Sequence, residues 1–192
     1  EFFDSIMPLL SDTQLIRLEH ERHRRSLARL ELLHRNLVSE LNPGAGPDLF
    51  GIMRRVEIDA AIELLVDEIL ANHAKRSLAA FRRFEREGRA AIDKVLDEVD
   101  RLGLRDMEMM AMVTFFADEA RQQELKDLVD VLSKPLQEAA AAVSRENLRA
   151  LRAMLEVLPP DAKRDVRRRF IKSGYSVVGN GVLSARSELV NL

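Results

Sequence analysis

Residues 11–41, SDTQLIRLEHERHRRSLARLELLHRNLVSEL, decide the fold class of this chain. Apolar residues and histidines recur along this stretch at alternating steps of four and three, which is typical of a helix face packed against another helix. We call these positions the seam: Ile16, His20, His23, Leu27, Leu30, His34, Leu37 and Leu41. Ser11 and Gln14 have the spacing of a capping box, which marks the start of a helix. The stretch therefore predicts a long amphipathic helix in an all-α protein.

The composition excludes several classes of protein. With 192 residues, 46% hydrophobic and 32% charged, the chain can bury a real core and does not resemble a disordered segment. A net charge of -2 gives no general attraction to nucleic acid or to an anionic membrane. The absence of cysteine excludes disulfides, thiolate metal sites and cysteine nucleophiles. No apolar run approaches the ~20 residues that span a bilayer.

Breaker residues divide the rest of the chain into further helices. The run NPGAGP, residues 42–47, ends the first helix, and because it is short we expect the first two helices to pack antiparallel. The further helices are expected from Asp48 to Gly103, at about 106–131, at 133–157 with Ser133 as its cap and Pro135 in its first turn, and from Pro160 to Gly174.

These elements predict long antiparallel amphipathic helices in a helical-hairpin bundle. An N-terminal hairpin half, residues 1–103, would carry a C-terminal half, residues 104–174, packed on it, and whether the halves are related stays open. The tail, residues 175–192, alternates weakly around Asn180-Gly181, so it is expected to be either a small hairpin or an irregular segment.

Two short motifs resemble the Spy/CpxP family of periplasmic chaperones and stress or heavy-metal sensors. Leu10-Ser11-Asp12-Thr13-Gln14 is similar to the L-T-x-x-Q signature, with Ser in place of Thr. LEVLPPDAKR, residues 155–164, resembles the Leu-Pro-Pro-acidic stretch that opens the last helix of heavy-metal-resistance relatives, but it lacks their Gln. The resemblance implies a helical, often dimeric, periplasmic protein that binds unfolded clients or senses stress or metal. It also leads us to expect a signal or anchor upstream of Glu1.

The histidines are candidates for a metal or proton response. In an antiparallel pair of helices, His73 would lie within about a turn of His20, and His23 shares a face with His20. His20, His23 and His73 would then offer ligands for a transition metal such as Zn, Ni, Co or Cu. The alternative is ordinary packing histidines, since no H-E-x-x-H spacing is present. A proton response needs only the imidazoles, because acidification would charge them and weaken the seam.

A set of methionine and phenylalanine residues is the candidate partner-binding surface. Methionine adapts its shape to varied partners, which suits a client-binding protein. The set comprises Met109, Met110, Met112, Phe115 and Phe116, together with Phe81 and Phe84. The alternative is a simple core, because Met109, Met112 and Phe116 share one helix face.

A dense basic surface lies on the last predicted helix. It comprises Lys163, Arg164, Arg167, Arg168, Arg169 and Lys172. Such a surface can contact phosphates or acidic partners. No groove-reading motif accompanies it, so the alternative is a solvated or partner-facing helix.

The sequence carries no Gly-rich phosphate loop, nucleophile elbow or zincin motif, so we expect a non-enzyme that requires no cofactor. The leading prediction is a periplasmic, homo-oligomeric helical protein that binds protein clients or a signalling partner. One alternative is a metal- or pH-responsive sensor domain that uses the seam histidines. Another is a cytosolic helical adaptor or nucleic-acid-associated protein that uses residues 163–172.

Overall fold

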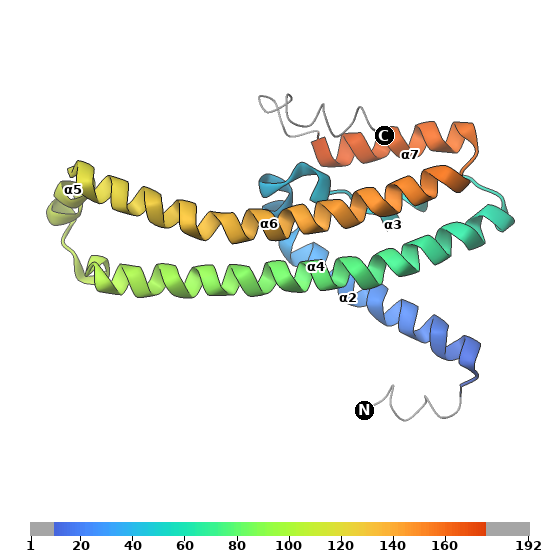
Figure 1. The fold of residues 1–192 in the computed structure, drawn as a ribbon, viewed down its shortest axis with the longest axis horizontal. Coiled ribbons are helices and arrows are strands. Elements are labelled where there is room, and N and C mark those ends of the chain that lie inside the picture. The colour runs from blue at the N-terminus through green and yellow to red at the C-terminus, as the bar shows by residue number, and fades with distance from the viewer. Residues whose placement is uncertain (1–9, 176–192) are drawn as a thin grey trace.

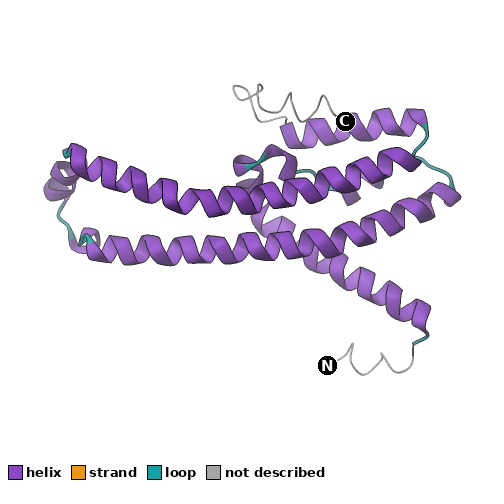
Figure 2. Ribbon diagram, viewed as in Figure 1, coloured by secondary structure: helices purple, strands orange, loops and turns teal. Residues whose placement is uncertain are grey.

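The structure, a computed structural model, describes residues 10–175, and within them every regular element is a helix (Figures 1 and 2). The all-α prediction is therefore confirmed. The elements are α2 (Asp12–Leu41), η2 (Pro43–Ala45), α3 (Leu49–Met53), α4 (Ala60–Arg101), η3 (Leu104–Asp106), α5 (Met109–Ala117), α6 (Glu119–Val157) and α7 (Pro160–Tyr175). No described helix is long and apolar enough to cross a membrane. The tail, residues 175–192, was expected to be either a small hairpin or an irregular segment; Tyr175 ends α7, and the rest of the tail lies outside the described residues.

The two longest helices, α4 and α6, form an antiparallel pair (Figure 1). At one level Arg83 of α4 faces Glu138 of α6, and their Nη2 and Oε2 atoms lie 3.9 Å apart. Further along, Arg101 forms an ion pair with Glu124. The pair joins the two predicted halves, residues 1–103 and 104–174, along most of its length, and the boundary at residue 103 falls at the turn between the helices.

α6 is longer than the sequence predicted. The expected break near residues 131–133 does not occur, and Pro135 lies inside the helix. The break lies instead at Asp118, whose Oδ1 atom accepts a hydrogen bond from the backbone N–H of Ala120 at 2.8 Å. A carboxylate cap of this kind satisfies backbone donors that a helix start leaves free. Asp118, a short polar residue directly before α6, was therefore a better boundary signal than Ser133 and Pro135.

α2 runs in the same general direction as α4 (Figure 1), so the expected antiparallel packing of the first two helices is wrong. His23 lines a groove together with Leu78 and Arg82, whereas His34 contacts Phe84 further along both helices. The reason is the connection between them, residues 42–59, which contains η2 and α3 and carries the chain back before α4 begins.

This connection is itself part of the core. Leu49, Ile52 and Met53 of α3 are buried. The side-chain amide of Asn147, on α6, donates to the carbonyl oxygen of Gly44 at 3.0 Å. This hydrogen bond helps to fix the path of the connection, because the buried carbonyl oxygen of Gly44 would carry a desolvation cost without a donor.

All the buried residues lie toward one end of the α4–α6 pair. We call that end, residues 10–87 and 132–175, the body; there α2, α3 and α7 cover the pair (Figure 1). One core cluster joins α3, α4, α6 and α7 around Leu151, Met154 and Phe170, and a second joins α2, α4 and α6 around Leu27, Phe81 and Phe84. We call residues 88–131 the arm; it projects from the body and ends at α5 (Figure 1).

Candidate functional site

The arm exposes apolar side chains over its whole length. No residue between Phe84 and Leu132 is buried in the structure. The large exposed apolar residues of the arm are Ile92, Val95, Leu96, Met109, Met110, Val113, Phe116, Val129 and Val131. A helix normally turns such residues toward a core, but two helices alone can cover only one face of each other. The arm therefore exposes apolar residues that a larger bundle would bury, and exposed apolar surface is typical of interaction sites where it is contiguous.

The end of the arm is its most apolar part. Met109 and Met110 are 81% and 76% exposed, and they begin α5. Phe115 instead packs against other residues of the arm. Arg121 of α6 lies 5.5 Å from the centroid of its ring, and Phe116 packs edge-on against it. The contact between Arg121 and Phe115 holds α5 against the start of α6. α5 is thus anchored by Phe115 and presents Met109 and Met110 outward.

Two members of the predicted partner-binding set lie elsewhere. Phe81 and Phe84 are each 1% exposed and belong to the core cluster that joins α2, α4 and α6. Their assignment to a binding surface is wrong, because α2 covers this part of α4. Met112 and Phe115 are half-buried, and Met109, Met110 and Phe116 are exposed.

Charge is divided unevenly between the arm and the body. The arm contains 11 acidic and 6 basic residues, whereas the body contains 18 acidic and 23 basic residues. The overall net charge of -2 hides this separation. An acidic surface that frames apolar groups favours partners that carry the opposite charge.

The histidines do not form a metal site. His73 is 3% exposed, its Nδ1 atom lies 3.0 Å from the hydroxyl oxygen of Ser77, and the ring also donates to the backbone of Glu146. Burial lowers the pKa of His73 to about 4. His20 is exposed, and the described residues contain no group of three or more His, Asp or Glu side chains placed to hold a metal ion. The predicted cluster of His20, His23 and His73 is therefore not formed, because His23 lines the groove between α2 and α4, whereas His73 packs against Phe50 and Glu146.

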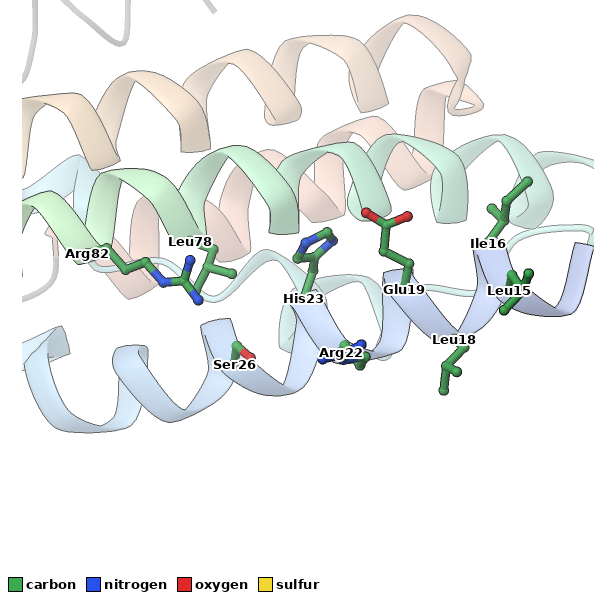
Figure 3. Close-up of a pocket in the computed structure, with 9 residues that line it drawn as sticks. All are labelled: Leu15, Ile16, Leu18, Glu19, Arg22, His23, Ser26, Leu78 and Arg82. Carbon is green, nitrogen blue, oxygen red and sulfur yellow. The ribbon is translucent and has the colours of Figure 1, made fainter. Parts of the chain in front are cut away.

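The first half of α2 diverges from α4 and leaves a groove of about 580 Å³ (Figure 3). Ile16, Glu19 and His23 point from α2 toward α4, and Leu18 points away (Figure 3). Ile16 is 55% exposed, so this part of the seam is not packed against another helix.

The buried face of α2 is shifted from the predicted seam. Leu27 is buried as expected, but Leu37 is 49% exposed and its neighbour Val38 is buried instead. Glu31 is buried as well. The same steps of four and three therefore occur, through Leu27, Glu31, His34, Val38 and Leu41. A ring nitrogen of His34, Nε2, is buried without a hydrogen-bond partner among the described residues.

Glu31 belongs to a charged cluster that the sequence did not predict. Its Oε2 atom accepts from Nη2 of Arg35 at 3.0 Å, and the same Nη2 lies 3.7 Å from Oδ2 of Asp48, the residue that caps α3. Burial raises the pKa of Glu31 to about 7, against the opposing effect of Arg35. The sequence did carry one signal for this cluster. Glu31 stands at core spacing between Leu27 and His34, and a buried carboxylate needs a partner.

Four of the six basic residues of the predicted surface on α7 fall into two groups. Arg164 pairs with Asp161, and Arg168 pairs with Asp165, on the exposed side of the helix. Arg169 and Lys172 instead line a hollow between α3 and α7. The opposite edge of the helix, Ala162, Val166 and Phe170, is buried.

Comparisons with known proteins give no relative for this arrangement. No family model matches the chain, no curated protein matches it, and no solved structure matches it.

Proposed function

We propose that this protein is a non-enzymatic binding protein whose arm captures apolar segments of other proteins. The supporting observation is the uncovered apolar surface of the arm, which contains no buried residue between Phe84 and Leu132. Met109, Met110 and Val113 at its end are 60–81% exposed, so binding would remove apolar area from water without disturbing the core. Unbranched methionine side chains would adapt to different segments.

The net negative charge of the arm favours one chemical class of partner. Its 11 acidic residues against 6 basic residues favour segments that are apolar and basic. A client that is bound in this way would keep a charged, soluble exterior. The Spy/CpxP-like motifs at residues 10–14 and 155–164 add to this proposal a chaperone role in the periplasm.

The test is suppression of aggregation of an unfolded basic client, such as reduced lysozyme, followed by light scattering. The arm variant combines Met109→Gln, Met110→Gln and Val113→Thr, all at exposed positions of α5. We expect it to lose most of the suppression, because these side chains provide the apolar contact. A matched control combines Leu32→Gln and Leu33→Gln, which are 84% and 64% exposed on α2 of the body.

The control variant should suppress aggregation as well as the unaltered protein. An arm variant that remains fully active would refute the assignment of the arm. An unaltered protein that fails to suppress aggregation even at several-fold excess would refute the chaperone role itself. Circular dichroism of both variants checks that the helices are intact.

A further inference from the structure

A hollow of about 490 Å³ lies between the end of α2, α3 and α7. Four cationic side chains line it: Arg35, Arg55, Arg169 and Lys172. Asp48 is the single carboxylate among the lining residues. The volume is within the range of about 300–1,000 Å³ that is typical of small-molecule sites.

Two of these cations are held in place by hydrogen bonds to acidic side chains. Arg35 donates to the buried carboxylate of Glu31 at 3.0 Å, and Nε of Arg169 donates to Asp165 at 2.7 Å. A guanidinium fixed through one edge keeps other N–H donors for a ligand. It also loses less conformational entropy when a ligand binds.

The other two cations carry the excess charge. Arg55 and Lys172 are exposed and form no ion pair or hydrogen bond with their side chains within residues 10–175. They come from α7 and from the segment that follows α3, so two separate parts of the chain bring uncompensated positive charge to one hollow. A second hollow of about 560 Å³ shares Arg35 and Asp48 with the first and adds Arg54 to the local charge.

We propose that the hollow between α3 and α7 binds a small oxyanion with more than one negative charge, of the pyrophosphate or organic phosphate class. Arg55 and Lys172 neutralise the ligand, and Arg35 and Arg169 offer planar donor edges that match its oxygens. A nucleic-acid surface is the less favoured alternative, because no aromatic side chain lines the hollow for base stacking. This inference is independent of the arm and of its proposed function.

The experiment is calorimetric titration of the full chain with inorganic pyrophosphate at about 50 mM salt, where screening is weak. The unaltered protein should bind saturably. The double variant Arg55→Gln, Lys172→Gln should bind roughly tenfold or more weakly, because it loses both uncompensated charges. The matched control, Lys163→Gln with Arg164→Gln, removes the same charge from α7 outside the hollow and should change the affinity by less than about twofold.

The charge-conserving variant Arg55→Lys, Lys172→Arg should retain binding, which separates loss of charge from loss of fold. Absence of saturable binding by the unaltered protein would overturn the site. Equal weakening in the double variant and in the control would also overturn it, because it would reduce the effect to general electrostatics. A short single-stranded RNA is the final probe. RNA binding that the control substitutions weaken, and that pyrophosphate does not displace, would place nucleic-acid binding on the outer face of α7. In that case the hollow would not be the site of RNA binding.

Discussion

Glu31 and His73 are buried groups whose pKa values are shifted in opposite senses, and replacement of either one should expose a pH dependence that the other hides. Burial raises the pKa of Glu31 from 4.5 to about 7 and lowers that of His73 from 6.5 to about 4. Both shifts favour the neutral form in the folded protein.

The signs follow from which state binds protons more tightly. Folded Glu31 is protonated more readily than unfolded Glu31, so its burial penalty is full above pH 7 and is relieved as the pH falls toward 4.5. His73 is protonated more readily in the unfolded chain, so its penalty is absent above pH 6.5 and grows as the pH falls toward 4. From pH 7 to pH 5, Glu31 therefore adds about 2 kcal/mol to the free energy of unfolding, and His73 removes about 2 kcal/mol.

The two contributions nearly cancel in the unaltered protein. The variant Glu31→Gln keeps an acceptor for Arg35 but does not titrate, so its free energy of unfolding should fall by about 2 kcal/mol between pH 7 and pH 5. The variant His73→Gln should show a rise of similar size. The carboxylates whose pKa is lowered by arginine partners, such as Glu21 and Asp165, titrate below this range and do not interfere.

Urea unfolding followed by circular dichroism at several pH values between 8 and 5 measures these profiles. The difference between each variant and the unaltered protein isolates one group, because all other ionisable residues are common to both. A Glu31→Gln profile parallel to that of the unaltered protein would refute the reasoning, since it would mean that Glu31 has the same proton affinity in the folded and unfolded chain.

Three further substitutions test the packing of the body and the path of α6 by urea unfolding. Asn147→Ala should cost about 2 kcal/mol, because it leaves the carbonyl oxygen of Gly44 buried without its donor; no measurable loss would contradict this role of the side chain. Gly174→Ala should cost about 1–3 kcal/mol, because the added Cβ would lie 2.8 Å from the carbonyl oxygen of Pro43, a backbone atom; an unchanged stability would show that α7 can shift. Pro135→Ala should stabilise the protein by about 1–3 kcal/mol, because an exposed proline inside α6 omits a backbone hydrogen bond; a loss of stability would contradict a continuous helix at this position.

The local signals of the sequence predicted the helices and several of their ends. The capping box is present, since the backbone N–H of Ser11 donates to Oε1 of Gln14 at 2.9 Å. Asp48 caps α3 rather than the long second helix, and Asp59 caps α4. Gly103 has a positive φ of 65°, which suits the end of a helix at glycine. Each of these features depends on neighbours within a few residues, so the sequence contains the whole interaction.

The direction of α2 could not be predicted in the same way. Residues 42–47 read as a short breaker, but the connection continues to Asp59, and its position depends on Asn147, about 100 residues away. Periodicity shows that a helix has a face to bury; it does not show which helix covers that face or in which direction that helix runs.

The same limit explains why the sequence did not separate the buried from the exposed members of the candidate partner-binding set. Phe81, Phe84, Met109 and Met110 all stand at apolar positions of helical patterns, and nothing in their spacing separates core from surface. The separation arises because α2 covers α4 near Phe84, whereas no residue of the arm is buried. Whether an apolar residue of α4 or α6 is exposed therefore depends on which other helices lie beside that stretch.

Under the proposed function, folding and binding would depend on different parts of one helix pair. The body contains the buried clusters around Phe81 and Leu151 and provides the burial that offsets the entropy of ordering the chain. The arm adds few buried contacts and relies on continuity with the body and on exposed ion pairs such as Arg101 with Glu124, which contribute little each. We therefore expect the arm to open at a lower free energy than the rest of the α4–α6 pair, and under the proposed function a bound partner would stabilise it. Substitutions on the arm surface should therefore change partner affinity with little effect on unfolding of the body, whereas core substitutions in the body should have the reverse effect.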